Sequence, residues 1–299
     1  MTLKQLEAFY WAATCASFAI AAERLHLSIS SLSKRINELE QSLGVGLFDR
    51  SGHKAELSEA GRRLVPRAWN LLQEAEAVRC CVAVDTGLSG RCRIGVGELT
   101  ALIWLPRLLK LARHEHPDLV VEPMVEVGAT LEHGLESGQL DCAVIAGRSP
   151  RPDICSERIG EARFSWVIAS DSEPGANAMS DRLLDAYPLI TLALGAGTTR
   201  LLDDWLNDSG LDVRQRLICN NWGAIAGLVS EGVGVGMLPA AWAAELARRG
   251  RIRVLKSSPA LGPLPYSFRW RRDDTRPVVP GMLAIARQAI DFSARNRLL

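Results

Sequence analysis

One short segment of the chain holds side chains that could bind DNA. Within eight residues it places the hydroxyls of Ser30, Ser31 and Ser33, the ammonium of Lys34 and the amide of Asn37. Side chains of these types bind base edges and phosphates when they lie on a helix in the major groove. A solvated polar face is the alternative for any single helix, so the neighbouring elements must decide between the two.

The surrounding elements have the pattern of a helix-turn-helix. Apolar residues recur at three- and four-residue spacing in three stretches, which predicts three short amphipathic helices. Ser17 is a candidate N-cap of the second helix, and Ser28 or Ser30 is a candidate N-cap of the third. Gly44 is a candidate stop at the end of the third helix.

A small wing is expected after the third helix. Residues 47–50 and 55–57 flank a polar turn, which predicts two short strands. Arg50 and Lys54 would add cations beside the third helix, where they suit phosphate contacts. We therefore assign residues 1–58 to a winged helix-turn-helix that binds double-stranded DNA.

A longer helical pattern covers residues 59–88. Its apolar residues recur about every three and a half positions, as in helices that pair with another helix. Pro66 interrupts the pattern and predicts either a kink or a helix start nearby. We expect this helix to join two copies of the chain.

From residue 91 onward, strand and helix patterns alternate. Strands separated by single helices predict a parallel sheet and an α/β domain. The pattern divides into a first lobe over residues 91–161, rejoined by residues 267–293, and a second lobe over residues 162–266. The expected fold class is α/β, with an α-rich winged helix-turn-helix in front of a two-lobed domain.

Composition excludes several classes of protein. The net charge is +1, and the first 60 residues hold six Lys and Arg against seven Asp and Glu, so DNA binding must depend on where single cations lie. The seven cysteines form no CxxC pair, and His114 and His116 stand alone, so we expect no disulfide framework, no metal and no cofactor. No apolar run is long enough for a membrane span or a signal peptide, which predicts a cytoplasmic protein without a membrane partner.

The N-terminal part of the chain resembles the LysR-type regulators. Four runs carry the resemblance: Ala21-Ala22-Glu23-Arg24-Leu25, Leu39-Glu40-Gln41-Ser42-Leu43-Gly44-Val45, Leu47-Phe48-Asp49-Arg50 and Leu57-Ser58-Glu59-Ala60-Gly61. The resemblance implies that Ser33 and Lys34 contact operator DNA, and that Arg50 reaches the backbone or the minor groove. Ile29 and Ser30 depart from the family pattern of Gln followed by Pro or Ser, and we expect this departure to alter half-site preference.

The resemblance also implies a periplasmic-binding-protein-like domain with an effector between its lobes. Thr100, Thr130 and Thr198 lie where strand patterns give way to helices, so their hydroxyls and the free N–H groups there suit a small anion. Trp222 could form an aromatic wall, and Arg148 could pair with an acidic group. The alternatives are simple helix caps for the three threonines, core packing for Trp222 and a solvated loop for Arg148.

These observations predict a DNA-binding transcriptional regulator whose operator binding responds to a small effector, an anion that can be aromatic. Family members usually assemble as homotetramers or as dimers of dimers, so a homodimer or homotetramer is expected. Peroxide-responsive members use a cysteine pair in the second lobe, where only Cys219 lies here. The alternatives are an architectural DNA-binding protein without a ligand and an enzyme built on the lobes. No nucleophile, acid–base pair or metal set in the sequence favours the enzyme.

Overall fold

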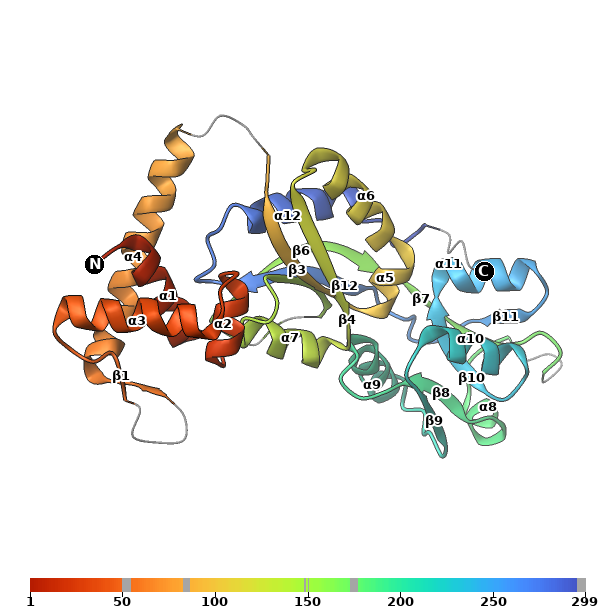
Figure 1. Cartoon of the computed structure of the whole chain (residues 1–299). Helices are drawn as coiled ribbons and strands as arrows, with labels where there is room; N and C mark the ends of the chain where they lie inside the picture. The colour runs from red at the N-terminus through yellow and green to blue at the C-terminus, as the bar shows by residue number, and fades with distance from the viewer. Residues whose placement is uncertain (50–54, 83–86, 148, 150, 173–176, 295–299) are drawn as a thin grey trace.

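The computed structural model describes residues 1–49, 55–82, 87–147, 149, 151–172 and 177–294. In Figure 1 a helical head lies at one end of the molecule, a first sheet occupies the middle and a second sheet lies at the other end. The expected fold class is confirmed: an α-rich head precedes two lobes that each combine a sheet with helices.

The head consists of three helices and a two-stranded wing. These are α1 (Leu3–Thr14), α2 (Phe18–Arg24), α3 (Ile29–Leu43), β1 (Phe48–Asp49) and β2 (Glu56–Leu57). The predicted caps are confirmed. The Ser17 hydroxyl accepts a hydrogen bond from the amide of Ile20, and the Ser28 hydroxyl accepts one from that of Ser31. Gly44 ends α3 with a left-handed φ of 68°, which glycine adopts without steric cost.

Packing fixes which side of α3 faces outward. Leu32, Ile36 and Leu39 share one side of the helix and are fully buried in the core of the head, while α3 packs against α1 and α2. The carboxylate of Glu40 accepts hydrogen bonds from two backbone amides at the start of the antiparallel wing, the nearer one 2.6 Å away at Leu47. The polar side of α3 is therefore left on the surface of the head.

The helix α4 (Glu59–Val82) continues through Pro66, which is well inside it rather than at its start. One side packs on the head, where Ala68 is buried and the Trp69 ring stacks on Tyr10 at 5.4 Å. Leu71 and Val78 are exposed on this helix. Part of the apolar stripe of this helix therefore packs against the head of the same chain. No helix in the described ranges combines the length and apolarity needed to cross a membrane.

The first lobe is a five-stranded sheet with helices on both faces. Its elements are β3 (Gly90–Val96), α5 (Glu98–Ile103), α6 (Leu105–Glu115), β4 (Leu119–Val125), α7 (Gly128–Glu136), β5 (Cys142–Ala146), β6 (Ile154–Ala162), β12 (Leu264–Arg271) and α12 (Val278–Ala289). The strand order is β4-β3-β5-β12-β6. Alternate residues of β5 face different layers: Ala143 packs with Leu131 of α7, whereas Val144 joins the core that holds α6 and α12.

The second lobe repeats this plan with a different set of strands. Its elements are β7 (Phe164–Ala169), α8 (Asp181–Ala186), β8 (Leu189–Leu192), α9 (Gly197–Ser209), β9 (Arg216–Cys219), α10 (Trp222–Ser230), β10 (Val235–Pro239), α11 (Ala240–Arg248) and β11 (Ile252–Leu255). The strand order is β11-β7-β10-β8-β9. Figure 1 shows this lobe beyond the first sheet, on the side away from the head.

Both sheets are mixed, whereas the alternation of strands and helices had predicted parallel ones. In the first lobe β4, β3 and β5 are parallel, and β12 is antiparallel to β5 and β6. In the second lobe β10, β8 and β9 are parallel, and β7 is antiparallel to β10 and β11. The chain passes from one lobe to the other between β6 and β7, and returns between β11 and β12. In each sheet one strand next to these crossings, β12 or β7, runs against the parallel set. The other, β6 or β11, is antiparallel to it and so points the same way as the parallel strands.

Gly61 allows α4 to pack closely on the wing. A Cβ added at Gly61 would lie 2.2 Å from the backbone oxygen of Leu47, whereas one added at Gly227 in α10 would meet open space. We expect Gly61→Ala to lower the free energy of unfolding by about 1–3 kcal/mol through overpacking. Gly227→Ala should raise it by about 0.5–1 kcal/mol, because alanine favours helix. Urea unfolding of both variants tests this, and a Gly61→Ala protein as stable as the wild type would contradict it.

Candidate functional site

The N-terminal half of α3 presents most of the residues that the sequence suggested for DNA contact. Four of them are exposed: Ser30, Ser31, Lys34 and Asn37. Ser33 is half-buried beside them. Arg50 and Lys54 lie outside the described residues. The surface of α3 therefore combines hydroxyl, amide and ammonium groups opposite its buried side, an arrangement that suits a major-groove helix.

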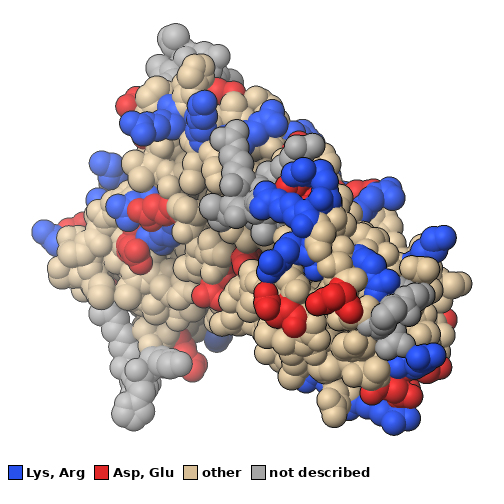
Figure 2. All heavy atoms as spheres, turned by 90° about the vertical axis from the view of Figure 1, so that its right-hand side faces the viewer, with Lys and Arg blue, Asp and Glu red and all other residues tan. Residues whose placement is uncertain are grey.

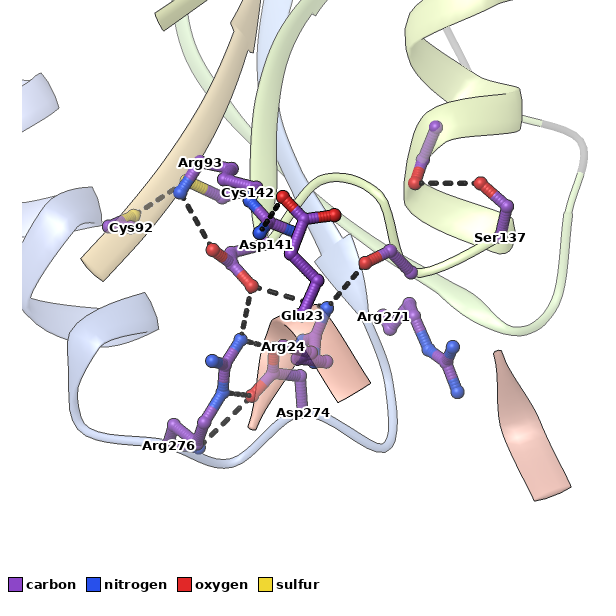
Figure 3. A network of polar contacts seen from close by, with 12 residues as sticks. Glu23, Arg24, Cys92, Arg93, Ser137, Asp141, Cys142, Arg271, Asp274 and Arg276 are labelled. Carbon is purple, nitrogen blue, oxygen red and sulfur yellow. Dashed lines mark hydrogen bonds and ion pairs between the residues drawn. The ribbon is translucent and has the colours of Figure 1, made fainter. Parts of the chain in front are cut away.

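A buried arginine joins the head to the first lobe. The side chain of Arg24, at the end of α2, is only 2% exposed and pairs with Asp274 at 2.6 Å and Asp141 at 3.2 Å (Figure 3). It also donates to the backbone oxygen of Gly138 at 2.9 Å. The guanidinium carbon lies 4.1 Å from the ring centroid of Trp11, a cation–π distance. A guanidinium with all these partners fixes where α2 rests on the lobe.

Arg276 balances the charge of this cluster. Its guanidinium pairs with both Asp141 and Asp274, so two cations face two carboxylates. Burial alone would raise the pKa of Asp274, but the hydrogen bond and charge of Arg276, together with the charge of Arg24, lower it below the ordinary value. Asp274 is therefore charged at neutral pH, and the buried ion pairs persist through the physiological range.

Further contacts surround the arginine cluster and widen the junction between head and lobe. They join Tyr10 to Asp273, the amide of Ala16 to the backbone oxygen of Ser137, Arg271 to the backbone oxygen of Thr14, and Glu23 to Arg93. Burial raises the pKa of Tyr10, and the hydrogen bond to Asp273 raises it further, so Tyr10 stays protonated and donates to Asp273. Each of these contacts pairs the head with the same end of the first lobe.

No pattern in the sequence predicts this junction. Arg24 belongs to a family motif, and a lone arginine near the end of a short helix is usually solvated. Its partners Gly138 and Asp274 are 114 and 250 residues further along the chain. Only the folded lobe brings them together.

A cavity of about 410 Å³ lies between the two lobes. The first lobe contributes Gly97, Glu98, Leu99, Val125, Glu126, Val127, Gly128, Leu131, Val144, Ile145, Ala146 and Tyr266, and the second lobe contributes Leu192, Ala193, Ala196, Gly197, Thr198, Asn220, Asn221 and Trp222. Its size suits a small molecule, and carboxyl ends of parallel strands from both lobes border it.

The structure brings two of the five sequence candidates to this cavity. Thr198 and Trp222 line it. Thr100 does not, because its side chain points into the core of the first lobe and is fully buried. Thr130 does not either: it is exposed on α7, while other residues of that helix face the cavity. Arg148 lies outside the described residues. The sequence pattern places these threonines near strand-to-helix junctions, but it does not fix the direction of each side chain.

Glu98 is the cavity residue that sequence reasoning missed. It begins α5 in the first lobe, and its two carboxylate oxygens lie 3.1 and 3.0 Å from the backbone N–H of Trp222, which begins α10 in the second lobe. Burial raises the pKa of Glu98, and the hydrogen bond from Trp222 opposes that rise. Its position directly after a strand could have singled it out. Trp222 packs its ring on Phe164 with a centroid distance of 5.6 Å.

A second, adjoining hollow of about 590 Å³ differs from the cavity in its charges. Its wall includes Arg200, Arg269, Glu132, Asp203 and Asp204. Arg269 is almost fully buried and already pairs with Glu132. Over the face seen in Figure 2, acidic and basic side chains are interspersed rather than separated. The part of the chain that the structure describes holds no cluster of His, Cys, Asp or Glu suited to a metal ion.

Comparison with known proteins settles the family. Residues 3–62 match the model of the bacterial regulatory helix-turn-helix protein of the lysR family, and residues 85–291 match the LysR substrate binding domain. This chain belongs to the LysR family of transcriptional regulators. That family consists of DNA-binding regulators rather than enzymes, and the two matches correspond to the head and the two lobes.

Individual relatives agree with this membership. The chain is 30% identical over 248 residues to a "Probable RuBisCO transcriptional regulator" of Emiliania huxleyi, covering 79% of this chain and 78% of that protein. It is 28% identical over 258 residues to the "HTH-type transcriptional regulator GltR" of Bacillus subtilis, covering 85% and 84%. A full-length OxyR variant from Pseudomonas aeruginosa has a similar fold, with a TM-score of 0.68, 23% identity and coverage of 99% and 97%.

Removing the Arg24 guanidinium should separate the head from the first lobe. Arg24→Met keeps the length of the side chain but withdraws a buried charge from its partners, a change that costs about 3–5 kcal/mol in comparable buried pairs. Calorimetry of this variant should show the head melting before the lobes. Arg249→Met, which removes a surface partner of Glu245, is the matched control and should leave the melting of the head and the lobes unchanged. An unchanged calorimetric trace for Arg24→Met would refute a structural role for the cluster.

Proposed function

We propose that this LysR-family regulator binds operator DNA through α3 and the wing, and that a small molecule in the cavity between the lobes changes this binding. The carrying observation is that the head and the cavity lie at opposite ends of the same sheet. β5 runs from Asp141, which pairs with Arg24 of the head, to Ala146 in the cavity wall. β3 holds Arg93, which pairs with Glu23, near its middle, and it leads to Gly97 in the cavity wall.

The helix α7 makes the same connection on one face of that sheet. Its first turn, at Gly128, lines the cavity. Just beyond its last turn, the backbone oxygens of Ser137 and Gly138 accept hydrogen bonds from Ala16 and Arg24 of the head. A helix of nine residues is about 14 Å long. A small displacement of α7 at its cavity end would therefore also displace the residues that contact the head.

These connections suggest how an effector acts. A ligand that binds one arrangement of the two lobes better than another shifts the population towards that arrangement. Because the first lobe is fixed to the head by buried ion pairs, the shift changes where the DNA-binding surface is presented. An architectural protein without a ligand would have no use for this cavity, and its operator binding would not respond to any metabolite.

Affinity is expected to come from paired heads. The head has no excess of positive charge, so a single copy should bind DNA weakly. Leu71 and Val78 on α4 are exposed and suit contact with a second copy, in a homodimer or a homotetramer. Two linked heads gain affinity because the second binds at a high effective concentration. In the proposed complex Ser30, Ser31, Ser33, Lys34, Asn37, Arg50 and Lys54 contact the DNA.

Lys34 provides the test of DNA binding. Operator fragments are first selected from genomic DNA with the full chain. Lys34→Ala should then weaken binding to all of them by about the same factor and lower the salt slope by about 1, as expected when a phosphate contact is lost. Lys110→Ala removes an exposed lysine of α6 and should change neither quantity. If both variants bind like the wild type, α3 is not the DNA-binding helix.

Filling the cavity tests the effector site. Ala193→Trp places an indole in the cavity wall, whereas Ala260→Trp places one on an exposed loop as a control. Metabolites that raise the melting temperature of the wild type and shift its operator binding should do neither in Ala193→Trp, which should still bind DNA. The control should keep both responses. A metabolite response that survives in Ala193→Trp places the effector elsewhere.

A further inference from the structure

The carboxylate of Glu98 occupies the place in the cavity where an anion would bind best. The start of a helix carries partial positive charge and free N–H groups, and α10 begins at Trp222. Glu98 already accepts the hydrogen bond of the Trp222 amide with both of its oxygens. The chain thus supplies its own anion at this helix start, from the opposite lobe.

The remaining charge of the cavity wall has the same sign. Glu126 is the second carboxylate that lines it, and none of its described lining residues is a lysine or an arginine. A carboxylate ligand would enter a partly enclosed space beside two like charges, where repulsion is stronger than in water. A positively charged ligand would be attracted by both carboxylates, and each carboxylate has lone pairs that can accept further hydrogen bonds.

Other residues of the wall suit a cation with an apolar body. Trp222 and Tyr266 add aromatic walls, which attract cations through their π faces. Most of the other lining residues are aliphatic or glycine.

From this arrangement we infer that the effector is a small, largely apolar molecule carrying one positively charged nitrogen, which pairs with Glu98 and Glu126. This inference rests on the proposed function of the cavity as the effector site, and it replaces the anion expected from the helix starts. Because Glu98 links α5 of one lobe to α10 of the other, a cation bound to Glu98 acts at the contact that holds the two lobes together.

The experiment compares ligands that share a body and differ in the charge of the head group. Three pairs serve as probes on the full chain: benzylamine with benzoate, tryptamine with indole-3-propionate, and hexylamine with hexanoate. At least one amine should raise the melting temperature more than its paired carboxylate. Glu98→Gln should weaken binding of that amine at least tenfold, because glutamine still accepts the hydrogen bond of Trp222 but carries no charge. Glu126→Gln should weaken it less, since Glu126 is the more exposed residue.

Two further variants make the result decisive. Glu115→Gln changes an exposed glutamate at the end of α6 and should leave amine binding unchanged. Arg200→Ala identifies carboxylates that bind in the adjoining hollow instead of the cavity. The inference is overturned if no amine binds, if carboxylates bind better in a manner independent of Arg200, or if Glu98→Gln leaves the amine affinity unchanged. A carboxylate that alters operator binding would overturn the ligand class and leave the proposed function intact.

Discussion

The burial of Arg24 between the head and the first lobe is the interaction on which the arrangement of this protein depends. A guanidinium removed from water is tolerated only where carboxylates and backbone oxygens replace its hydration, and Asp141, Asp274 and Gly138 do so here. Those three residues come from two loops at one end of the first sheet. These contacts fix the position of the head on the first lobe. The polar side of α3 stays exposed on the surface of the head.

The direction of the strands in the first lobe then decides where the cavity lies. With the head fixed beside Arg93 of β3 and the amino end of β5, the carboxyl ends of both strands point away from it, towards the second lobe. A cleft beyond the carboxyl ends is where α/β sheets commonly bind ligands. The antiparallel β12 passes between the same two ends in the reverse direction, from Tyr266 in the cavity wall to Arg271 beside the head. The DNA-binding part and the cavity are thus connected by one rigid sheet.

In the effector class that we propose, the charge of the cavity wall outweighs the preference of helix starts for an anion. A helix N-terminus favours an anion, and several helices begin at the cleft. Here the favoured anion is Glu98, a residue of the chain itself, and it connects the lobes while it occupies the helix start. The start of α10 therefore attracts the carboxylate of Glu98, and this contact holds α10 to α5. The rest of the cavity is lined mainly by a second carboxylate and apolar side chains.

The sequence by itself determined the features that depend on neighbours along the chain. The caps at Ser17 and Ser28, the stop at Gly44 and the exposed side of α3 follow from contacts within one or two helical turns, and the family follows from four short motifs. Only the tertiary structure decided that Arg24 is buried, that Thr100 faces the core and that Glu98 binds the start of α10. These outcomes depend on pairs such as Arg24 with Asp274 and Glu98 with Trp222, which are 250 and 124 residues apart. The physical reason is that charge and burial are set by everything within a few ångströms in space, whereas a sequence pattern records only neighbours along the chain.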